Sequence, residues 1–127
     1  MSGYTFPDVR EALFTLVPRA MDGVKPYYQL TIDFADRLPA ALIYRVGGEQ
    51  SGPFRLDRVA IDVYAEGSSA ANDVAQQVCS FLADSWHDAD GALLDSVEVE
   101  VTPTEVPYMS DTVNLVSATY RVATRAA

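Results

Sequence analysis

The chain has 127 residues, of which 49% are hydrophobic and 21% charged, a composition typical of a globular domain rather than of a disordered chain or a coiled-coil rod. At roughly 100–200 residues per domain, this length predicts a single domain over residues 1–127. The formal net charge is −9, and no basic residue lies between Arg58 and Arg121. Because nucleic-acid binding requires clustered Lys and Arg, this imbalance disfavours direct contact with DNA, RNA or anionic membranes.

The sequence also indicates a compartment. Its N-terminus lacks a basic stretch followed by an apolar one, so we predict no secretory signal and a site of action inside the cell. No apolar run approaches the roughly 18–20 residues of a spanning helix. The single cysteine, Cys79, cannot close an intramolecular disulfide, and no Cys/His cluster has the spacing of zinc ligands. We therefore expect neither a disulfide scaffold nor a zinc finger.

The N-terminal part predicts one helix and an irregular connection. Apolar residues recur at helical spacing over about residues 6–17, with Thr5 as a candidate N-cap and Pro18 at the predicted end. Residues 18–39 contain several prolines and one apolar piece, which predicts a connection with one short strand or turn.

Two strands follow. Residues 40–46 read as a short strand that ends at Gly47-Gly48, and residues 47–53 as a hairpin loop. Residues 54–65 then alternate between apolar and polar positions, so one face of this strand is expected to point to the core.

The second half of the chain is also predicted to contain one helix followed by two strands. A helix is predicted from Ser68 to about Gly91, because apolar residues up to Trp86 recur at helical spacing. Strands are predicted over residues 93–101, with Leu93 inward and Leu94 outward, and over about 112–124.

The element order α-β-β-α-β-β predicts an α+β fold. We expect a four-stranded, mainly antiparallel sheet with two helices packed on one face. The connection over residues 102–111 is rich in turn formers, and it forms the second of two extended loops, after that at 47–53.

One cluster has the residue types of a metal site. Asp84, His87 and Asp88 lie at i, i+3 and i+4 of the predicted helix, but further ligands are missing, and a solvated acidic helix end explains the same residues. A nucleophilic pair reduces to Cys79 and His87, whose separation of eight residues is about 12 Å along a helix, too far for a hydrogen bond. We interpret Cys79 as a small, partly buried residue.

Two further motifs are weak. Glu98 and Glu100 are same-face neighbours about 7 Å apart without an apolar pocket, so a solvated face explains them better than a glycosidase pair. Gly47-Gly48 lacks the lysine and following helix of a phosphate loop, and is interpreted as a hairpin turn. We therefore predict no catalytic, cofactor-binding or metal-binding residues, no cofactor, and a protein that is not an enzyme.

The sheet face opposite the helices is the stronger candidate for function. Its predicted outward residues are one aromatic, Tyr64, the small polar Ser117 and Thr119, and a set of mixed charges: Arg58, Asp62, Glu98, Glu100, Arg121 and Arg125. Such a face can simply be solvated. A sheet covered on one side also has edges to protect, and docking against copies of the same chain is a common solution, so we predict that these six charged residues form a subunit interface.

The arrangement resembles the tail terminator proteins of long-tailed bacteriophages, including that of phage lambda. The stretches that carry the resemblance are Pro-Asp-Val-Arg-Glu-Ala-Leu at 7–13, Leu-Pro-Ala-Ala-Leu-Ile-Tyr-Arg-Val-Gly-Gly at 38–48, the strand 57–65, the helix start 69–75 and the closing strand 118–125. The resemblance covers about residues 7 to 125, and its motifs are short and not catalytic.

The resemblance implies a virion protein of the tail or neck, assembled in the host cytoplasm. It implies a hexameric ring on the head-proximal end of the tail tube, which stops tube polymerisation and presents a surface to the head–tail connector proteins. DNA would pass through the ring without specific binding. The two extended loops would contact the major tail tube protein or a neighbouring subunit, through Gln50 and Pro53 in one loop and Pro107, Tyr108 and Met109 in the other.

We expect the second loop to become ordered mainly on such contact, because Tyr108 and Met109 have no place in the predicted core. Two alternatives remain open. One is a head-completion or head–tail joining neck protein, which would also form rings. The other is a small-ligand-binding α+β domain with a pocket between helix and sheet.

Overall fold

The computed structural model describes residues 3–127, which fold into an α+β domain of two helices, a short 3-10 helix and six strands. In chain order the elements are α1 (Val9–Ala20), β1 (Lys25–Tyr27), η1 (Phe34–Asp36), β2 (Ala40–Ser51), β3 (Phe54–Glu66), α2 (Ser68–Leu82), β4 (Ser85–Ala89), β5 (Ala92–Val106) and β6 (Val113–Arg125). The α+β class is confirmed. In this part of the chain no helix is both long and apolar enough to cross a membrane.

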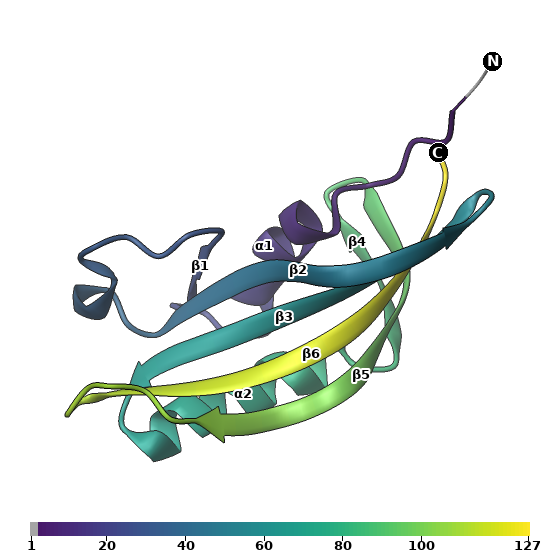
Figure 1. The fold of residues 1–127 in the computed structure, drawn as a ribbon. Coiled ribbons are helices and arrows are strands. Elements are labelled where there is room, and N and C mark those ends of the chain that lie inside the picture. Colours follow the sequence, from purple (N-terminus) through teal and green to yellow (C-terminus); the bar gives the residue numbers. More distant parts are fainter. Residues whose placement is uncertain (1–2) are drawn as a thin grey trace.

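The strands form one curled sheet in the order β1-β2-β3-β6-β5-β4 (Figure 1). The β1–β2 pair is parallel and every other pair is antiparallel. Both helices lie behind the sheet in Figure 1, so one face is covered by helices. The prediction of four strands is wrong, because β1 and β4 are too short to show a period-2 pattern in the sequence.

The main core lies between the helices and the sheet. Alternate residues of β3 and β6 are buried there, among them Val59, Ile61 and Val63, as the alternation predicts. They pack against Leu13 of α1 and other apolar residues of both helices. Full burial of each such side chain contributes about 1.5–3 kcal/mol, so this layer dominates the stability of the fold.

Helix α1 begins and ends later than predicted. Asp8, not Thr5, is the N-cap, and its carboxylate accepts hydrogen bonds from the backbone N–H groups of Arg10 and Glu11. Pro18 lies inside the last turn, and the helix continues to Ala20. A proline so close to the C-terminus removes only one helical hydrogen bond, and burial of the apolar side of α1 outweighs that loss.

Helix α2 ends at Leu82, well before the predicted Gly91. Asp84 adopts a left-handed conformation with φ of 56° and turns the chain into the edge strand β4. Trp86, which continues the helical spacing in the sequence, is 66% exposed on this strand. The helical spacing of apolar residues in the sequence therefore continues for one turn beyond the end of the helix.

The β2–β3 hairpin is longer than predicted. Gly47 and Gly48 lie within β2, where the pairing with β3 shifts between Arg45 and Gly47, and the turn is Gly52-Pro53. The interpretation of Gly47-Gly48 as the hairpin turn, and of residues 47–53 as a loop, is therefore wrong. A glycine inside a strand is a known mark of a bulge.

Strand β5 also differs from its prediction. It runs to Val106, so the connection to β6 is shorter than residues 102–111. Leu94 is fully buried and Leu93 is 47% exposed, the reverse of the expectation. Leu94 and Val97 are both buried, three positions apart, so strict alternation does not hold at this end of β5.

Candidate functional site

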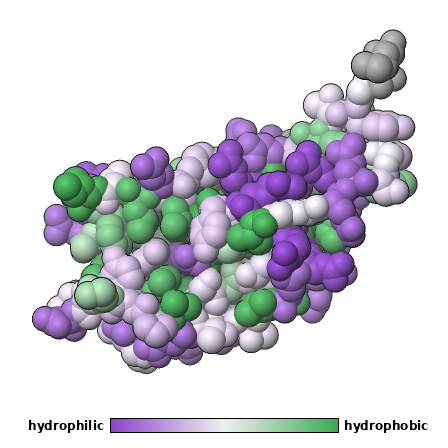
Figure 2. All heavy atoms as spheres, in the orientation of Figure 1, coloured by the Kyte–Doolittle hydropathy of each residue, from purple (hydrophilic) through white to green (hydrophobic). Residues whose placement is uncertain are grey.

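The open face of the sheet, opposite the helices, has two unlike ends. Hydrophobic residues gather on it near β1 and η1, whereas hydrophilic ones gather over the side of the β2–β3 hairpin (Figure 2). We call the first the aromatic end and the second the charged end. The buried residues of the aromatic end are Ala40, Tyr64, Val113 and Leu115, packed against Tyr27, Leu30, Phe34, Leu38 and Leu42.

Tyr64 is the centre of the aromatic end. Its ring packs edge-on against Phe34 at 5.2 Å and against Tyr108 at 5.3 Å between ring centroids. Burial raises the pKa of Tyr64 to about 12, helped by the nearby Asp62. Two expectations are corrected here: Tyr64 is buried rather than exposed, and Tyr108 does have a packing partner within the chain. Met109, in contrast, is fully exposed.

Asp62 is also not exposed as predicted. Only 8% of the residue is accessible, and its carboxylate accepts hydrogen bonds from the Tyr44 hydroxyl at 3.2 Å and the Ser117 hydroxyl at 2.5 Å. Burial, followed by the negative charge of Asp62, raises the pKa of Tyr44. Residues of the segment that contains β1 and η1 pack against the neighbouring Tyr64, and the sequence of that segment has no periodicity that predicts this contact.

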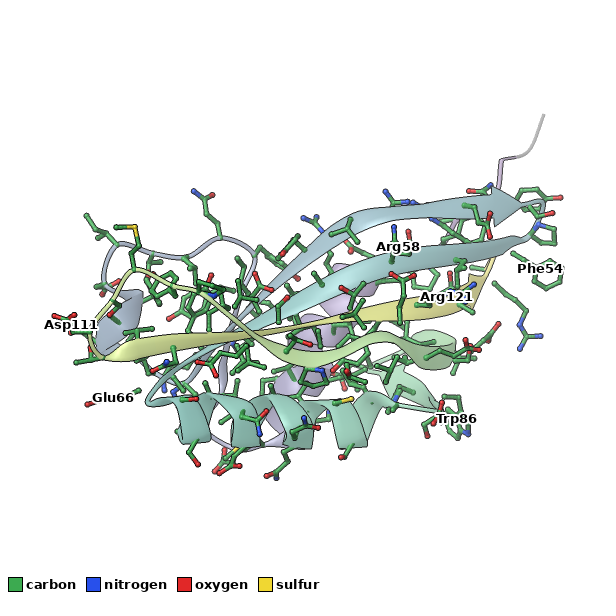
Figure 3. The ribbon with its side chains drawn as sticks, turned by 60° about the horizontal axis from the view of Figure 1, so that its bottom comes forward. Phe54, Arg58, Glu66, Trp86, Asp111 and Arg121 are labelled. Atoms are coloured by element: carbon green, nitrogen blue, oxygen red, sulfur yellow. The ribbon has the colours of Figure 1, made fainter. Side chains whose placement is uncertain are left out.

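The charged end is accessible. Arg58 and Glu100 form a bidentate ion pair there, with Arg58 Nε 2.8 Å from Glu100 Oε1. This hydrogen bonding lowers the pKa of Glu100 and raises that of Arg58. Arg121 lies opposite both Arg58 and Glu98 in the sheet register. Figure 3 shows Arg58 and Arg121 on neighbouring strands of this face.

Three of the six predicted interface residues, Arg58, Glu100 and Arg125, are at the surface but paired within the chain. Arg125 pairs with Asp95 at 2.9 Å, and Glu98 is exposed. Of the six, Asp62 alone is buried. A role of the other five between subunits stays a prediction.

Two long stretches of strand edge have no strand beside them in the described part of the chain. Strand β1 pairs with β2 only at Ala40–Leu42, so the outer edge of residues 43–51 is free. Strand β4 pairs with β5 only as far as Val97, so the outer edge of residues 98–106 is free. Unpaired backbone N–H and C=O groups at such edges are templates for pairing with another chain.

Both free edges carry exposed apolar side chains. On β2 these are Tyr44, 37% exposed, and Val46, 44% exposed; on β5 they are Val101, 47% exposed, and Val106, 37% exposed. Shifts in register interrupt each edge, at residues 45–47 of β2 and twice between 99 and 104 of β5. Such irregularities limit uncontrolled pairing at a free edge.

The predicted contact residues lie at opposite ends of the molecule. Gln50 and Pro53 are exposed at the tip of the β2–β3 hairpin, next to Phe54, which is 58% exposed. Pro107 and Met109 lie in the loop before β6, at the end marked by Asp111 (Figure 3). Contact of either end with a tube protein stays a prediction.

The residues considered for chemistry have structural partners. His87 stacks on Phe81 and its Nε2 lies 3.0 Å from the Leu82 carbonyl oxygen. The Asp88 carboxylate accepts a hydrogen bond from Gly91 N–H in the β4–β5 turn. The two residues are on a strand, so the helical spacing that suggested a shared face does not apply. Within residues 3–127, no group of three or more His, Cys, Asp or Glu is placed to hold a metal ion.

No protein-family model matches the chain, and no curated protein matches it.

Proposed function

We propose that the protein is a self-assembling structural subunit of a bacteriophage tail, specifically a tail terminator that forms a ring on the head-proximal end of the tail tube. The observation that carries the proposal is the pair of free edges, residues 43–51 of β2 and 98–106 of β5, on opposite sides of one sheet. The resemblance of the sequence to tail terminators supports the same function.

The directions of the two edges favour a closed ring. From β2 to β3, β6 and β5 every step is antiparallel, so β2 and β5 run in opposite directions. Rotation about a ring axis preserves the sense of each strand along that axis. The β5 of one copy would therefore meet the β2 of the next as an antiparallel neighbour, which extends the sheet by a head-to-tail contact that closes under cyclic symmetry.

The offset between the edges also fits a barrel. Gly47, in the middle of the free β2 edge, is level with Arg58, Arg121 and Glu98, the first residue of the free β5 edge. Pairing the full edges therefore requires successive copies to be staggered along the strands. Closed barrels have such a stagger, because their strands tilt relative to the barrel axis.

In this proposal the ring acts by shape. It occupies the next position on the tube but offers no repeat of the tube's own joining surface, so growth stops, and its other side receives the connector proteins. The ring is proposed to be a hexamer in the virion neck. A chain of net charge −9 lets DNA pass without strong adhesion to the lumen.

The assembly step is tested by charge substitutions on the free edges. Val46→Lys and Val101→Lys place a lysine on each edge, a device by which sheets avoid pairing. We expect both to abolish rings in light scattering and electron microscopy, on the protein alone or on tail tubes. Leu93→Lys is the matched control, because Leu93 is as exposed as Val101 but lies where β4 already covers β5. Rings that persist in both edge variants contradict the proposal.

The terminator role is tested with polymerising tube protein. We expect tube length to shorten as the concentration of the wild-type chain rises, and to stay unchanged with Val46→Lys. Unchanged tubes together with tight binding to a purified head–tail connector would assign the chain to head–tail joining instead.

A further inference from the structure

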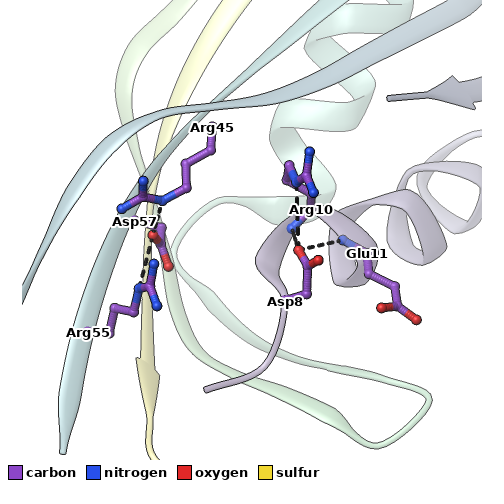
Figure 4. Close-up of polar contacts among 6 residues, drawn as sticks. All are labelled: Asp8, Arg10, Glu11, Arg45, Arg55 and Asp57. Atoms are coloured by element: carbon purple, nitrogen blue, oxygen red, sulfur yellow. Dashed lines mark hydrogen bonds and ion pairs between the residues drawn. The ribbon is translucent and has the colours of Figure 1, made fainter. Parts of the chain in front are cut away.

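A cleft of about 560 Å³ lies between the start of α1 and the β2–β3 hairpin, away from the charged end of the open face. Its charged lining residues are Asp8, Arg10, Arg45, Arg55 and Asp57, shown in Figure 4, and its walls include Phe6 and Tyr44. We call it the arginine cleft. Tyr44 and Arg45 lie on the free edge of β2, but the other cleft residues have no part in the function proposed above.

A buried carboxylate orients two of the arginines. The Asp57 side chain is only 3% exposed, and its Oδ1 accepts hydrogen bonds from Arg45 Nε at 2.5 Å and from Arg55 Nε at 3.3 Å. Burial of an unpaired carboxylate is costly, and both guanidinium groups compensate the charge of Asp57. The attraction to this one carboxylate holds the two guanidinium groups in place.

The outer ends of these arginines are available. Within the described residues, no hydrogen-bond acceptor contacts the Nη atoms of Arg45 or Arg55. The two side chains are 41% and 33% exposed, so these donors are accessible. Each guanidinium thus uses one donor on Asp57 and presents the remaining donors to the cleft and solvent. Planar guanidinium groups with free Nη donors are suited to carboxylates and phosphates.

The charge of the cleft is unusual for this chain. Three of its nine basic residues line the cleft against two acids, which gives a local charge of +1 in a chain of net charge −9. Elsewhere arginines pair singly with carboxylates, as Arg19 does with Asp90 and Arg58 with Glu100. Only at Asp57 do two arginines share one carboxylate among the ion pairs of residues 3–127.

Gly48 belongs to the same arrangement. A Cβ at this position would lie 2.9 Å from Arg45 Nη2 and 2.4 Å from the Leu56 carbonyl oxygen. The glycine therefore gives the Arg45 guanidinium room beside Asp57.

We propose that the arginine cleft binds carboxylate groups of an acidic segment of a protein partner, through the Nη donors of Arg45 and Arg55. A carboxylate is favoured over a phosphate for two reasons. The cleft carries a single excess positive charge, which matches a monoanion. The first N–H groups of α1, which would otherwise bind phosphate, are already occupied by Asp8.

The cleft adjoins the proposed ring contact, because Arg45 lies within the free edge of β2 at residues 43–51. Arg55 and Asp57 lie on β3, and Phe6 and Asp8 precede α1, so most of the cleft lies outside that edge. A monomer can therefore bind an acidic segment, and a ring can form without one, so the two proposals fail independently.

The test is titration of the full chain with a fluorescent peptide of five Glu-Ser repeats, followed by anisotropy. We expect saturable binding that weakens by about tenfold in Arg45→Gln and in Arg55→Gln, since each removes a charged hydrogen bond. Arg121→Gln removes an arginine outside the cleft and should leave the affinity unchanged. A peptide of five Gln-Ser repeats should not bind.

Three results would overturn the proposal: no binding by the wild-type chain, wild-type affinity in both cleft variants, or inorganic phosphate that occupies the cleft at lower concentration than the acidic peptide. If Arg45→Gln fails to fold, Arg45→Lys decides, because it keeps a positive charge beside Asp57 but lacks the Nη pair. Unchanged peptide affinity in Arg45→Lys would equally contradict the proposal.

Discussion

The two ends of the open face are built on the same strands, but one end is covered by another segment of the chain and the other is exposed. At the aromatic end, the segment that contains β1 and η1 folds back over Tyr64 and buries it to 6% exposure. At the charged end no segment of residues 3–127 covers the strands, and Arg58, Glu100 and Arg121 face solvent. The first end contributes to folding, whereas the second is left for contacts with solvent or other chains.

The largest effect is expected at the aromatic end. Tyr64→Ala removes a buried ring and its contacts with Phe34 and Tyr108, and should lower the free energy of unfolding by about 3 kcal/mol. Chemical denaturation measures it. Tyr4→Ala, at a side chain that is 57% exposed, is the control and should change little. A loss below about 1 kcal/mol for Tyr64→Ala would mean that the end is not a second core.

Alkaline pH should weaken the same end. The pKa of Tyr64 is about 12 in the fold against 10.0 in an unfolded chain, so the folded state holds this proton more tightly. The stabilising contribution is complete below pH 10 and is lost as the pH rises through about 12. Denaturation at a series of pH values should show this fall, and it should be smaller in Tyr64→Phe. An identical fall in that variant would contradict the assignment.

Substitution of Asp62, which lies between the two ends of the open face, tests whether its carboxylate contributes to stability. Asp62→Ala leaves the Tyr44 and Ser117 hydroxyls without their acceptor and should lower the free energy of unfolding by about 2 kcal/mol. Glu98→Ala, at an exposed acid, should leave it unchanged. Equal effects of the two substitutions would show that Asp62 is as accessible as the sequence predicted.

The smallest effect is expected at the charged end. Because Arg58 and Glu100 pair at the surface, Arg58→Ala should leave the unfolding transition of the isolated chain unchanged. A clear loss of stability would mean that the pair is part of the fold. If the pair also lies between copies, Arg58→Ala should weaken ring formation, measured by light scattering.

The sequence predicted the regular parts of this fold for a physical reason. On β3 and β6 the residues that face the helices are apolar at every second position, so period-2 alternation marks Val59, Ile61 and Val63 directly. Strands β1 and β4 are too short for any period to appear. The burial of Tyr64 depends on the segment of β1 and η1, which has no periodic pattern, and that of Asp62 accompanies hydrogen bonds from Tyr44 and Ser117 on the adjacent strands. Neither can be predicted from the strand that holds them.

The arginine cleft was not predicted because its residues come from three places in the chain. Arg45 and Asp57 meet only through the register of β2 and β3, which a bulge shifts at residues 45–47. The available signal was Gly47-Gly48 inside a strand-like run, which marks a bulge or a close approach as readily as a turn. The free edges were likewise hidden, because they depend on how far β1 and β4 extend along their neighbours.

Pairing between the free edges of β2 and β5 is tested most directly by cross-linking between copies. In a Cys79→Ser background, Glu49→Cys marks the β2 edge and Thr102→Cys the β5 edge, and a short thiol cross-linker tolerates an undefined register. The double variant should give a ladder of covalent oligomers that ends at the size of the ring, while each single variant stays uncross-linked. Monomers alone in the double variant, on tail tubes as well as in solution, or dimers in either single variant, would contradict head-to-tail pairing of the two edges.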